Sequence, residues 1–240
     1  MKKKIKVPYA IPFSIIFAFL ISGCTTGYYY DLSSRELARL KLDAVRGDGG
    51  AAHRISQYYR YTREDYNNTF IWTLIGAENG YRRSMDDLTA FYFGGYRIDE
   101  KCPMRAIFWL YQLAVSNDLD TEGYWRQETF IKQLENEGYT LETARPPGDS
   151  LFPPVSSLSG SDLTRYEEGA LQGSGQAALV LANHYNNTGE AESAEYWYRI
   201  GAQNGTTECQ EQYGNILMGK SENLDRERGK FWLARANVGW

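Results

Sequence analysis

The sequence predicts an all-α protein in which antiparallel helix pairs stack side by side into a solenoid. A tryptophan recurs four times, with a small residue three positions before it and another four or five positions after it. The segment that precedes each tryptophan segment alternates small and large apolar residues on one helical face. Together the two segments form a unit of about 35 residues, a period typical of helical repeats. One such pair cannot cover its own apolar face, so neighbouring pairs must stack.

Residues 1–23 have the pattern of an export signal. Lysines at positions 2, 3, 4 and 6 precede an apolar run from about Ile11 to Ile21, which is short for a transmembrane helix. The run ends in Ile21-Ser22-Gly23-Cys24. This ending resembles the lipobox of bacterial lipoproteins, whose cysteine receives a diacylglycerol and becomes the first residue of the mature chain. The alternative is an uncleaved anchor helix in which the cysteine is incidental.

The lipobox resemblance implies that Cys24 is lipidated and that the lipid holds the protein to a membrane, facing the periplasm. Removal of residues 1–23 takes away four lysines and changes the formal charge from −4 to −8. An acidic chain of this kind is a poor ligand for nucleic acid. Thr25 follows the cysteine in place of Asp, and by resemblance to enterobacterial lipoproteins this favours the outer membrane. Residues 24–31 are interpreted as a short tether.

Residues 32–142 are predicted to form a first helical repeat block. Ser33, Ser34 and Glu36 offer capping groups for its first helix. Two repeat units follow, at 51–84 around Trp72 and at 84–121 around Trp109. A further helical segment is expected at 122–138.

Residues 143–162 are predicted to be a Pro-rich loop between two repeat blocks. The pairs Pro146-Pro147 and Pro153-Pro154 exclude a helix there. A segment of this length without a repeat pattern is long for a compact domain. The second helical repeat block, 163–240, contains units at 177–209 around Trp197 and at 209–240 around Trp232.

The small residues of each unit are expected to let two helices approach closely, while the tryptophans fill the wedge between pairs. This pattern resembles the Sel-one-like repeat, a relative of the tetratricopeptide repeat, whose unit reads A-x3-L-G-x2-Y, a loop, then D-x2-KA-x2-WY-x2-AA-x2-G. The lysine of that motif is absent before Ala106 and Ala194. The resemblance implies a right-handed superhelical solenoid. By analogy with tetratricopeptide stacks, the first helix of each pair would line its concave surface.

Signals for catalysis are scarce, and we predict that the protein is not an enzyme and binds no metal or cofactor. His53 and His184 lie in no metal-binding spacing, and the sequence contains no G-x-S-x-G elbow and no P-loop. Acidic pairs such as Asp86-Asp87 are interpreted as solvated, although two carboxylates meeting in a cleft would leave a glycosidase as the least favoured alternative. Cys102 and Cys209 are expected to be unpaired thiols, with a single disulfide as the alternative.

The first helices carry extra aromatic residues off the face that packs within each pair. An aromatic stripe beside an arginine has the composition of a protein interface. The alternative is that these rings pack under the loops. The candidate partner-binding residues are Arg54, Tyr58, Tyr61, Phe91, Tyr96 and His184.

These observations predict a lipid-anchored periplasmic module that binds a protein partner. One specific version is an immunity protein that neutralises a secreted toxin, such as a type VI lipase effector, because Sel-one-like lipoproteins resemble known partners of that kind. The alternative is a structural or regulatory scaffold for envelope assembly or signalling.

Overall fold

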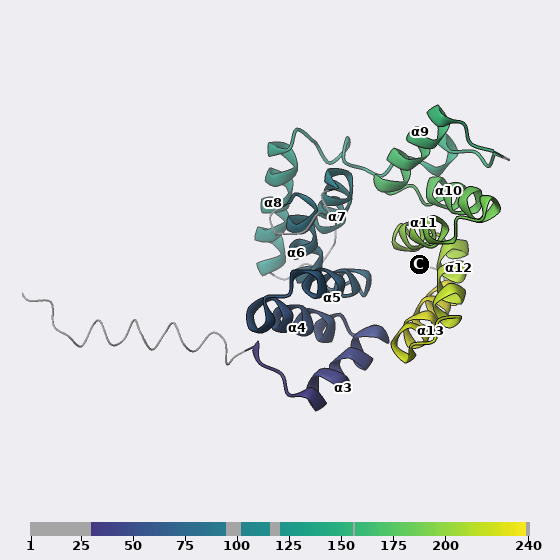
Figure 1. Ribbon diagram of the computed structural model, residues 1–240. Helices are drawn as coiled ribbons and strands as arrows, with labels where there is room; N and C mark the ends of the chain where they lie inside the picture. The colour runs from purple at the N-terminus through teal and green to yellow at the C-terminus, as the bar shows by residue number, and fades with distance from the viewer. Residues whose placement is uncertain (1–29, 95–101, 116–120, 156, 239–240) are drawn as a thin grey trace, which may run out of the picture.

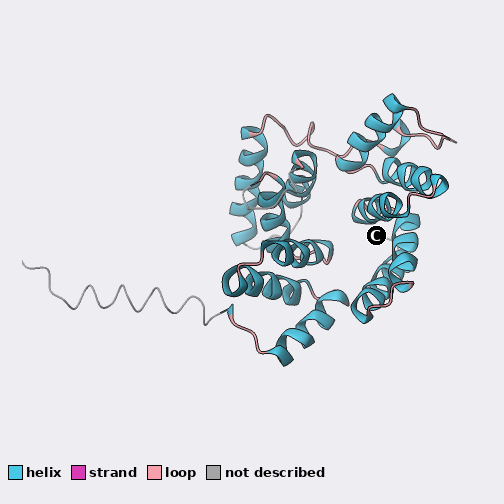
Figure 2. Cartoon of the chain, in the orientation of Figure 1, coloured by secondary structure: helices cyan, strands magenta, loops and turns pink. Residues whose placement is uncertain are grey.

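The computed structural model describes residues 30–94, 102–115, 121–155 and 157–238 (Figures 1 and 2). Within these ranges the chain forms eleven α-helices and no strand, which confirms the all-α prediction. No described helix has both the length and the apolar character needed to cross a membrane. The predicted signal segment, Cys24 and most of the tether lie outside the described residues.

Six helices belong to the first part of the chain and five to the second. The first part contains α3 (Ser34–Val45), α4 (Gly49–Tyr58), the π-helix η1 (Tyr59–Arg63), α5 (Tyr66–Glu78), α6 (Arg82–Tyr92), α7 (Pro103–Val115) and α8 (Thr121–Asn136). The second part contains the 3-10 turn η2 (Asp149–Leu151), α9 (Gly160–Leu171), α10 (Gly175–Thr188), α11 (Ala191–Gln203), α12 (Thr207–Met218) and α13 (Asn223–Val238).

Local side-chain chemistry sets several helix boundaries. The Ser33 hydroxyl accepts a hydrogen bond from the Glu36 N–H at the start of α3, as the sequence predicts. Asp48 caps α4 and Asp65 caps α5 in the same way. After α5, Gly80 adopts a left-handed φ of 82°, which suits glycine at the end of a helix.

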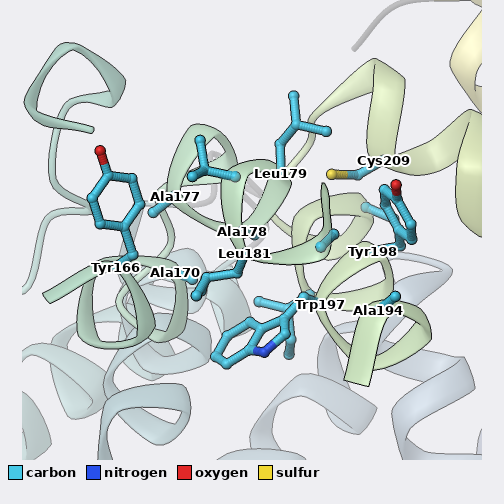
Figure 3. Close-up of a cluster of buried hydrophobic side chains, with 14 of the residues drawn as sticks. Tyr166, Ala170, Ala177, Ala178, Leu179, Leu181, Ala194, Trp197, Tyr198 and Cys209 are labelled. Atoms are coloured by element: carbon cyan, nitrogen blue, oxygen red, sulfur yellow. The ribbon is translucent and has the colours of Figure 1, made fainter. Parts of the chain in front are cut away.

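Small residues bring helices into close contact, as the repeat pattern predicts. A Cβ on Gly76 of α5 would collide with Ser84 of α6, and a Cβ on Gly201 of α11 would collide with Cys209 of α12. Large rings fill the remaining space, and Figure 3 shows Trp197 and Tyr198 in the core of the second part. All four repeat tryptophans are buried: Trp72, Trp109, Trp197 and Trp232.

The helices close into a ring (Figure 1). Helices adjacent in sequence pack together from α3 to α8 and from α9 to α13. Beyond these neighbours, α7 contacts α9, and the last helix, α13, returns to contact the first, α3. Arg46 and Glu227 form an ion pair of 2.8 Å across this second junction.

The two junctions that close the ring are built in the same way. Gly47, after α3, has a φ of 117° and would meet Phe231 of α13 if it carried a Cβ. Gly173, after α9, also has a φ of 117° and would meet Phe108 of α7. The ring therefore consists of two halves with the same order of helices and matching junctions, α3–α7 and α9–α13, and α8 is an addition to the first half.

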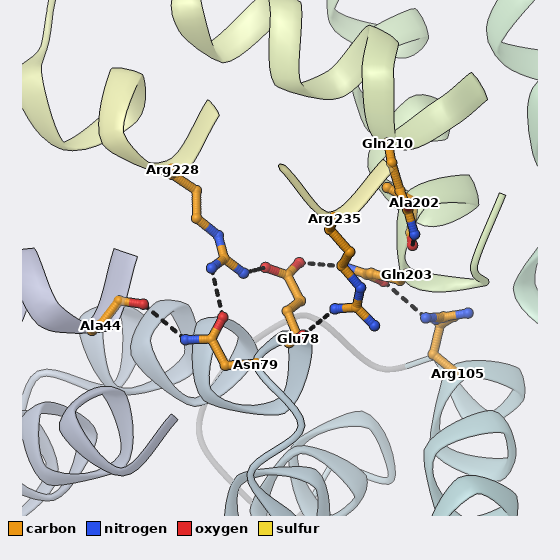
Figure 4. A network of polar contacts seen from close by, with 9 residues as sticks. All are labelled: Ala44, Glu78, Asn79, Arg105, Ala202, Gln203, Gln210, Arg228 and Arg235. Carbon is orange, nitrogen blue, oxygen red and sulfur yellow. Dashed lines mark hydrogen bonds and ion pairs between the residues drawn. The ribbon is translucent and has the colours of Figure 1, made fainter. Parts of the chain in front are cut away.

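The second helices of the pairs face the interior of the ring. Polar side chains from α5, α7, α11 and α13 meet there (Figure 4). The expectation that the first helices line the inner, concave surface is therefore wrong. The physical reason is the pair of closing junctions, which bring the tryptophan-bearing helices of both halves face to face.

The Pro-rich stretch has no α-helix between Asn136 and Gly160, in line with its prolines, although α9 begins inside the predicted loop. This stretch is anchored on the second half. Phe152 is buried against Tyr166, whose hydroxyl donates a hydrogen bond of 2.7 Å to the Pro153 carbonyl. The Asp149 carboxylate accepts from the Ser174 hydroxyl at 2.7 Å and so ties the loop to the start of α10.

Candidate functional sites: the ring interior and the π-helical turn

A buried polar cluster holds the two halves together (Figure 4). Arg228 of α13 donates to the Glu78 carboxylate at 2.7 Å and to the Asn79 side-chain oxygen at 2.6 Å. Its guanidinium also stacks over Phe231, 4.0 Å from the ring centroid. Asn79 in turn donates to the Ala44 carbonyl at 2.8 Å, so one arginine connects α13, α5 and α3.

Arg105 of α7 makes the equivalent contacts on the other side. It donates to the side-chain oxygens of Gln203 at 2.8 Å and Asn204 at 2.9 Å, and it lies 4.0 Å from the Phe108 centroid. Asn204 donates to the Ala170 carbonyl at 2.8 Å, as Asn79 does to Ala44. We call each of these arginines, with the side chains that it binds, a clasp. The two clasps differ at one position, where the first half has Glu78 and the second has Gln203.

Further hydrogen bonds to Glu78 join the two halves at the centre of the ring. Gln203 donates to the Glu78 carboxylate at 2.7 Å, and Arg235 donates to the Glu78 backbone carbonyl at 2.6 Å. Gln203 thus lies between Glu78 and Arg105, because it also accepts from Arg105 at 2.8 Å. Arg105 is 1% exposed and is bound by neutral oxygens alone, and burial lowers the pKa of its guanidinium.

The π-helix η1 forms a second candidate site, on the outer surface of the first half. A π-helical turn is rare and is frequently found at functional sites. It ends at Glu64, which has a left-handed φ of 52°, unusual for a residue other than glycine. Tyr61 is 47% exposed here, and its ring stacks on Tyr30 at 4.7 Å with Arg60 5.1 Å from its centroid.

A hollow of about 490 Å³ lies beside this turn. Its described lining consists of Tyr30, His53, Arg54, Gln57 and Arg83, so it contains two arginines and no carboxylate among these residues. The pKa of His53 falls to about 4, first because the side chain is largely buried and then because Arg83 and Arg60 lie near. His53 is therefore neutral at pH 7, and Arg83 supplies positive charge to the hollow, whereas Arg54 is paired with Glu36 at 2.7 Å.

Two of the predicted partner-binding rings lie in the interior. Phe91 is 0% exposed and packs edge-on against Phe70 at 5.6 Å. Tyr58 is 3% exposed, and its hydroxyl accepts from Arg63 at 2.6 Å. The prediction that Tyr58 and Phe91 form part of an exposed binding surface is therefore wrong. Both are core residues, because the faces of α4 and α6 that carry them pack against neighbouring helices.

The other predicted site residues are scattered. Arg54 is exposed and forms an ion pair of 2.7 Å with Glu36, which fastens α4 to α3. His184 lies on α10, in the other half of the ring, in edge contact with Tyr185. Tyr61 remains exposed, whereas Tyr96 and Cys24 lie outside the described residues. The structure therefore brings Arg54 and Tyr61 to one region and leaves His184 apart.

Cys102 and Cys209 are unpaired, as expected, and burial raises the pKa of the Cys209 thiol to about 12. In the part of the chain that the structure describes, no cluster of three or more His, Cys, Asp or Glu side chains could hold a metal ion.

The comparisons with known proteins add one weak similarity. The sequence is 26% identical over 120 residues to the uncharacterized protein YibG of Escherichia coli (strain K12), across 46% of this chain and 74% of YibG. No family model matches the sequence, and no solved structure matches it. The fold and the sites described above therefore rest on this chain alone.

The repeat pattern of tryptophans and small residues does not reveal the buried contacts of Arg105 and Arg228. A signal for these contacts exists, because Arg105-Ala106-Ile107-Phe108-Trp109 and Arg228-Gly229-Lys230-Phe231-Trp232 share an arginine four positions before the tryptophan. Likewise, Glu78-Asn79-Gly80 matches Gln203-Asn204-Gly205. An alignment of the repeats that compared polar as well as apolar positions would have matched both the arginines and the Asn-Gly segments that they bind.

Proposed function

We propose that this protein is a Sel-one-like repeat lipoprotein that binds a protein partner at the periplasmic face of the outer membrane. Its helix pairs wind with the right-handed sense of that repeat class, and the lipid on Cys24 anchors the chain. The export signal and the lipobox support the anchor, and the recurring tryptophan unit supports the repeat class. The role of the ring is to hold a binding surface rigidly beside the membrane.

The observation that carries the proposal is the surface of the π-helical turn. Tyrosine and arginine are the residue types most enriched at the energetic centres of protein interfaces. Here Tyr61 is exposed, stacked on Tyr30 and flanked by arginines, beside a hollow that holds Arg54 and Arg83. In a protein of negative net charge, this surface would favour a partner that presents an acidic segment.

The binding test uses the mature chain without its lipid and the partner that it captures. Tyr61→Ala should weaken the affinity by about 2 kcal/mol or more, as truncation of an interface anchor does, and leave the melting temperature unchanged. Leu151→Ala is the matched control, because Leu151 is 59% exposed on the Pro-rich stretch of the other half. Equal affinity of the Tyr61 variant and the wild type would place the interface elsewhere.

The same complex separates the two roles within this proposal. As an immunity protein, the chain would inhibit a bound toxin in proportion to occupancy. Binding to an envelope component without inhibition would assign the chain to the scaffold class instead.

The anchor has its own test. Cys24→Ala should leave an unprocessed precursor that incorporates no labelled fatty acid, because the cysteine is the acceptor of the lipid. Normal labelling of this variant would refute the lipobox interpretation and leave the uncleaved anchor helix.

A further inference from the structure

A second cavity lies inside the ring, away from the π-helical turn. Its volume is about 440 Å³, within the range of small-molecule sites. Aromatic and aliphatic side chains from α5, α12 and α13 form much of its wall, including Phe70, Trp72, Leu217 and Leu224. Arg199 of α11 lines the same cavity.

The Arg199 guanidinium has no hydrogen-bond acceptor among the described residues. Its Nε is buried without a hydrogen-bond partner, and the guanidinium lies 5.4 Å from the Tyr196 ring centroid. Burial alone would lower the pKa of the guanidinium, but the nearby Tyr213 and Glu78 side chains raise it, so Arg199 stays charged. Glu78 also lines the cavity, but its two carboxylate oxygens already accept from Gln203 and Arg228, each at 2.7 Å. Arg199 itself is half-buried, and a buried donor such as its Nε costs free energy when it has no acceptor.

The repeat itself does not require an arginine at this position. The residues two positions after the other repeat tryptophans are Leu74, Tyr111 and Ala234. An apolar side chain therefore satisfies the packing in the sister units, and Arg199 is not explained by the fold.

Four other charged residues line the cavity beside Arg199 and Glu78. Arg228 is paired with Glu78 at 2.7 Å. Lys41 lies 5.7 Å from the Trp72 and Tyr59 centroids, and Glu222 and Asp225 come from the start of α13. Neither Glu222 nor Asp225 forms an ion pair with Arg199 in the described part of the chain.

We propose that this cavity binds a small amphipathic anion, whose carboxylate pairs with Arg199 and whose apolar body lies along the aromatic and aliphatic wall. The charge-assisted bonds would satisfy the guanidinium, and burial of the apolar body would add the hydrophobic contribution. This site is independent of the partner surface at the π-helical turn.

Octanoate is the probe, titrated into the mature chain by calorimetry. We expect Arg199→Leu, which copies Leu74, to weaken octanoate binding by roughly tenfold to a hundredfold, the value of charge-assisted hydrogen bonds. Arg199→Lys should retain part of the affinity, and Arg46→Leu, an exposed arginine of the α3–α13 junction, should retain all of it. Octanol, which has the same chain without the charge, should bind as weakly as octanoate binds the Arg199→Leu variant.

Three results would overturn the proposal: no octanoate binding to the wild-type chain, equal binding to Arg199→Leu, or tighter binding of octylamine than of octanoate. Thermal unfolding of each variant checks that lost binding does not reflect lost structure. Tyr61→Ala should bind octanoate normally, so failure of this site and failure of the partner surface are distinguishable.

Discussion

Single buried charges determine how the centre of the ring is held. The Glu78 and Arg228 side chains are 4% and 6% exposed, and they join residues 150 positions apart. Loss of one member of a buried pair leaves the other charge without a partner, which costs more than the pair contributes. Arg105 occupies the position of the second half that corresponds to Arg228. Its buried guanidinium is held without a carboxylate, by the amide oxygens of Gln203 and Asn204 and by the Phe108 ring.

Glu78→Ala and Arg228→Met should each lower the free energy of unfolding by about 3–5 kcal/mol, because each leaves one buried charge unpaired. The double variant should cost less than the sum of the two. The control is Arg46→Ala with Glu227→Ala, a pair across the same junction in which Arg46 is 55% exposed. That pair should contribute far less than the Glu78–Arg228 pair, because solvent screens exposed charges. Denaturant unfolding measures all of these variants, and additive single-variant costs at Glu78 and Arg228 would contradict the account.

His53 predicts a pH dependence of stability. Its pKa is lowered to about 4 in the folded chain against 6.5 for the free side chain, so the unfolded state binds more protons between these values. Stability should therefore fall as the pH is lowered from about 6.5 to 4. The neighbouring Asp87 has a raised pKa because of its burial and acts in the opposite sense.

His53→Gln removes this contribution and should flatten the fall in stability over the same pH range. Denaturant midpoints at several pH values, measured for both proteins, provide the test. A parallel loss of stability in the two proteins would show that His53 titrates normally in the folded state.

At the scale of the helix pair, the fold depends on tryptophans wedged between small residues. Trp72 and Trp197 are 5% and 7% exposed, so each contributes a large buried area. Trp72→Ala and Trp197→Ala should each cost about 3–5 kcal/mol, as loss of a buried aromatic does. Tyr196→Ala is a suitable control, because Tyr196 precedes Trp197 in α11 but is 39% exposed. Unchanged melting temperatures in the tryptophan variants would show that these rings are not part of the core.

The helix pairs are also the scale at which the sequence was most informative. The spacing of Trp72 and Gly76, and of Trp197 and Gly201, predicted buried helices in close contact, because burial and periodicity are local properties of one helix face. The same reasoning misjudged Tyr58 and Phe91. A large aromatic side chain off the main packing face of a helix can be exposed or can pack against another helix. Which of the two occurs depends on where the next helix pair lies, and the sequence of one pair does not show this.

At the scale of the whole molecule, the ring results from contacts that no local pattern reveals. Arg228 finds Glu78, and Arg105 finds Gln203, only when the two halves fold back on each other. The repeat pattern describes each half but not how the last helix meets the first. Closure also places the tryptophan-bearing helices inside, so the wide concave surface of an open solenoid is replaced by a filled interior with small cavities.

Closure of the ring is the central claim, and a cross-link between α3 and α13 tests it most directly. The mature chain without its lipid would carry Arg46→Cys and Glu227→Cys, with Cys24 and Cys102 replaced by serine and Cys209 by alanine. A short bifunctional maleimide should join the two new cysteines within one molecule, because the native side chains at these positions lie 2.8 Å apart at their charged ends. Arg46→Cys with Asp162→Cys, which pairs α3 with α9 at the other end of the ring, should not react. Equal, low cross-linking of the two pairs in the folded monomer would mean that the solenoid is open.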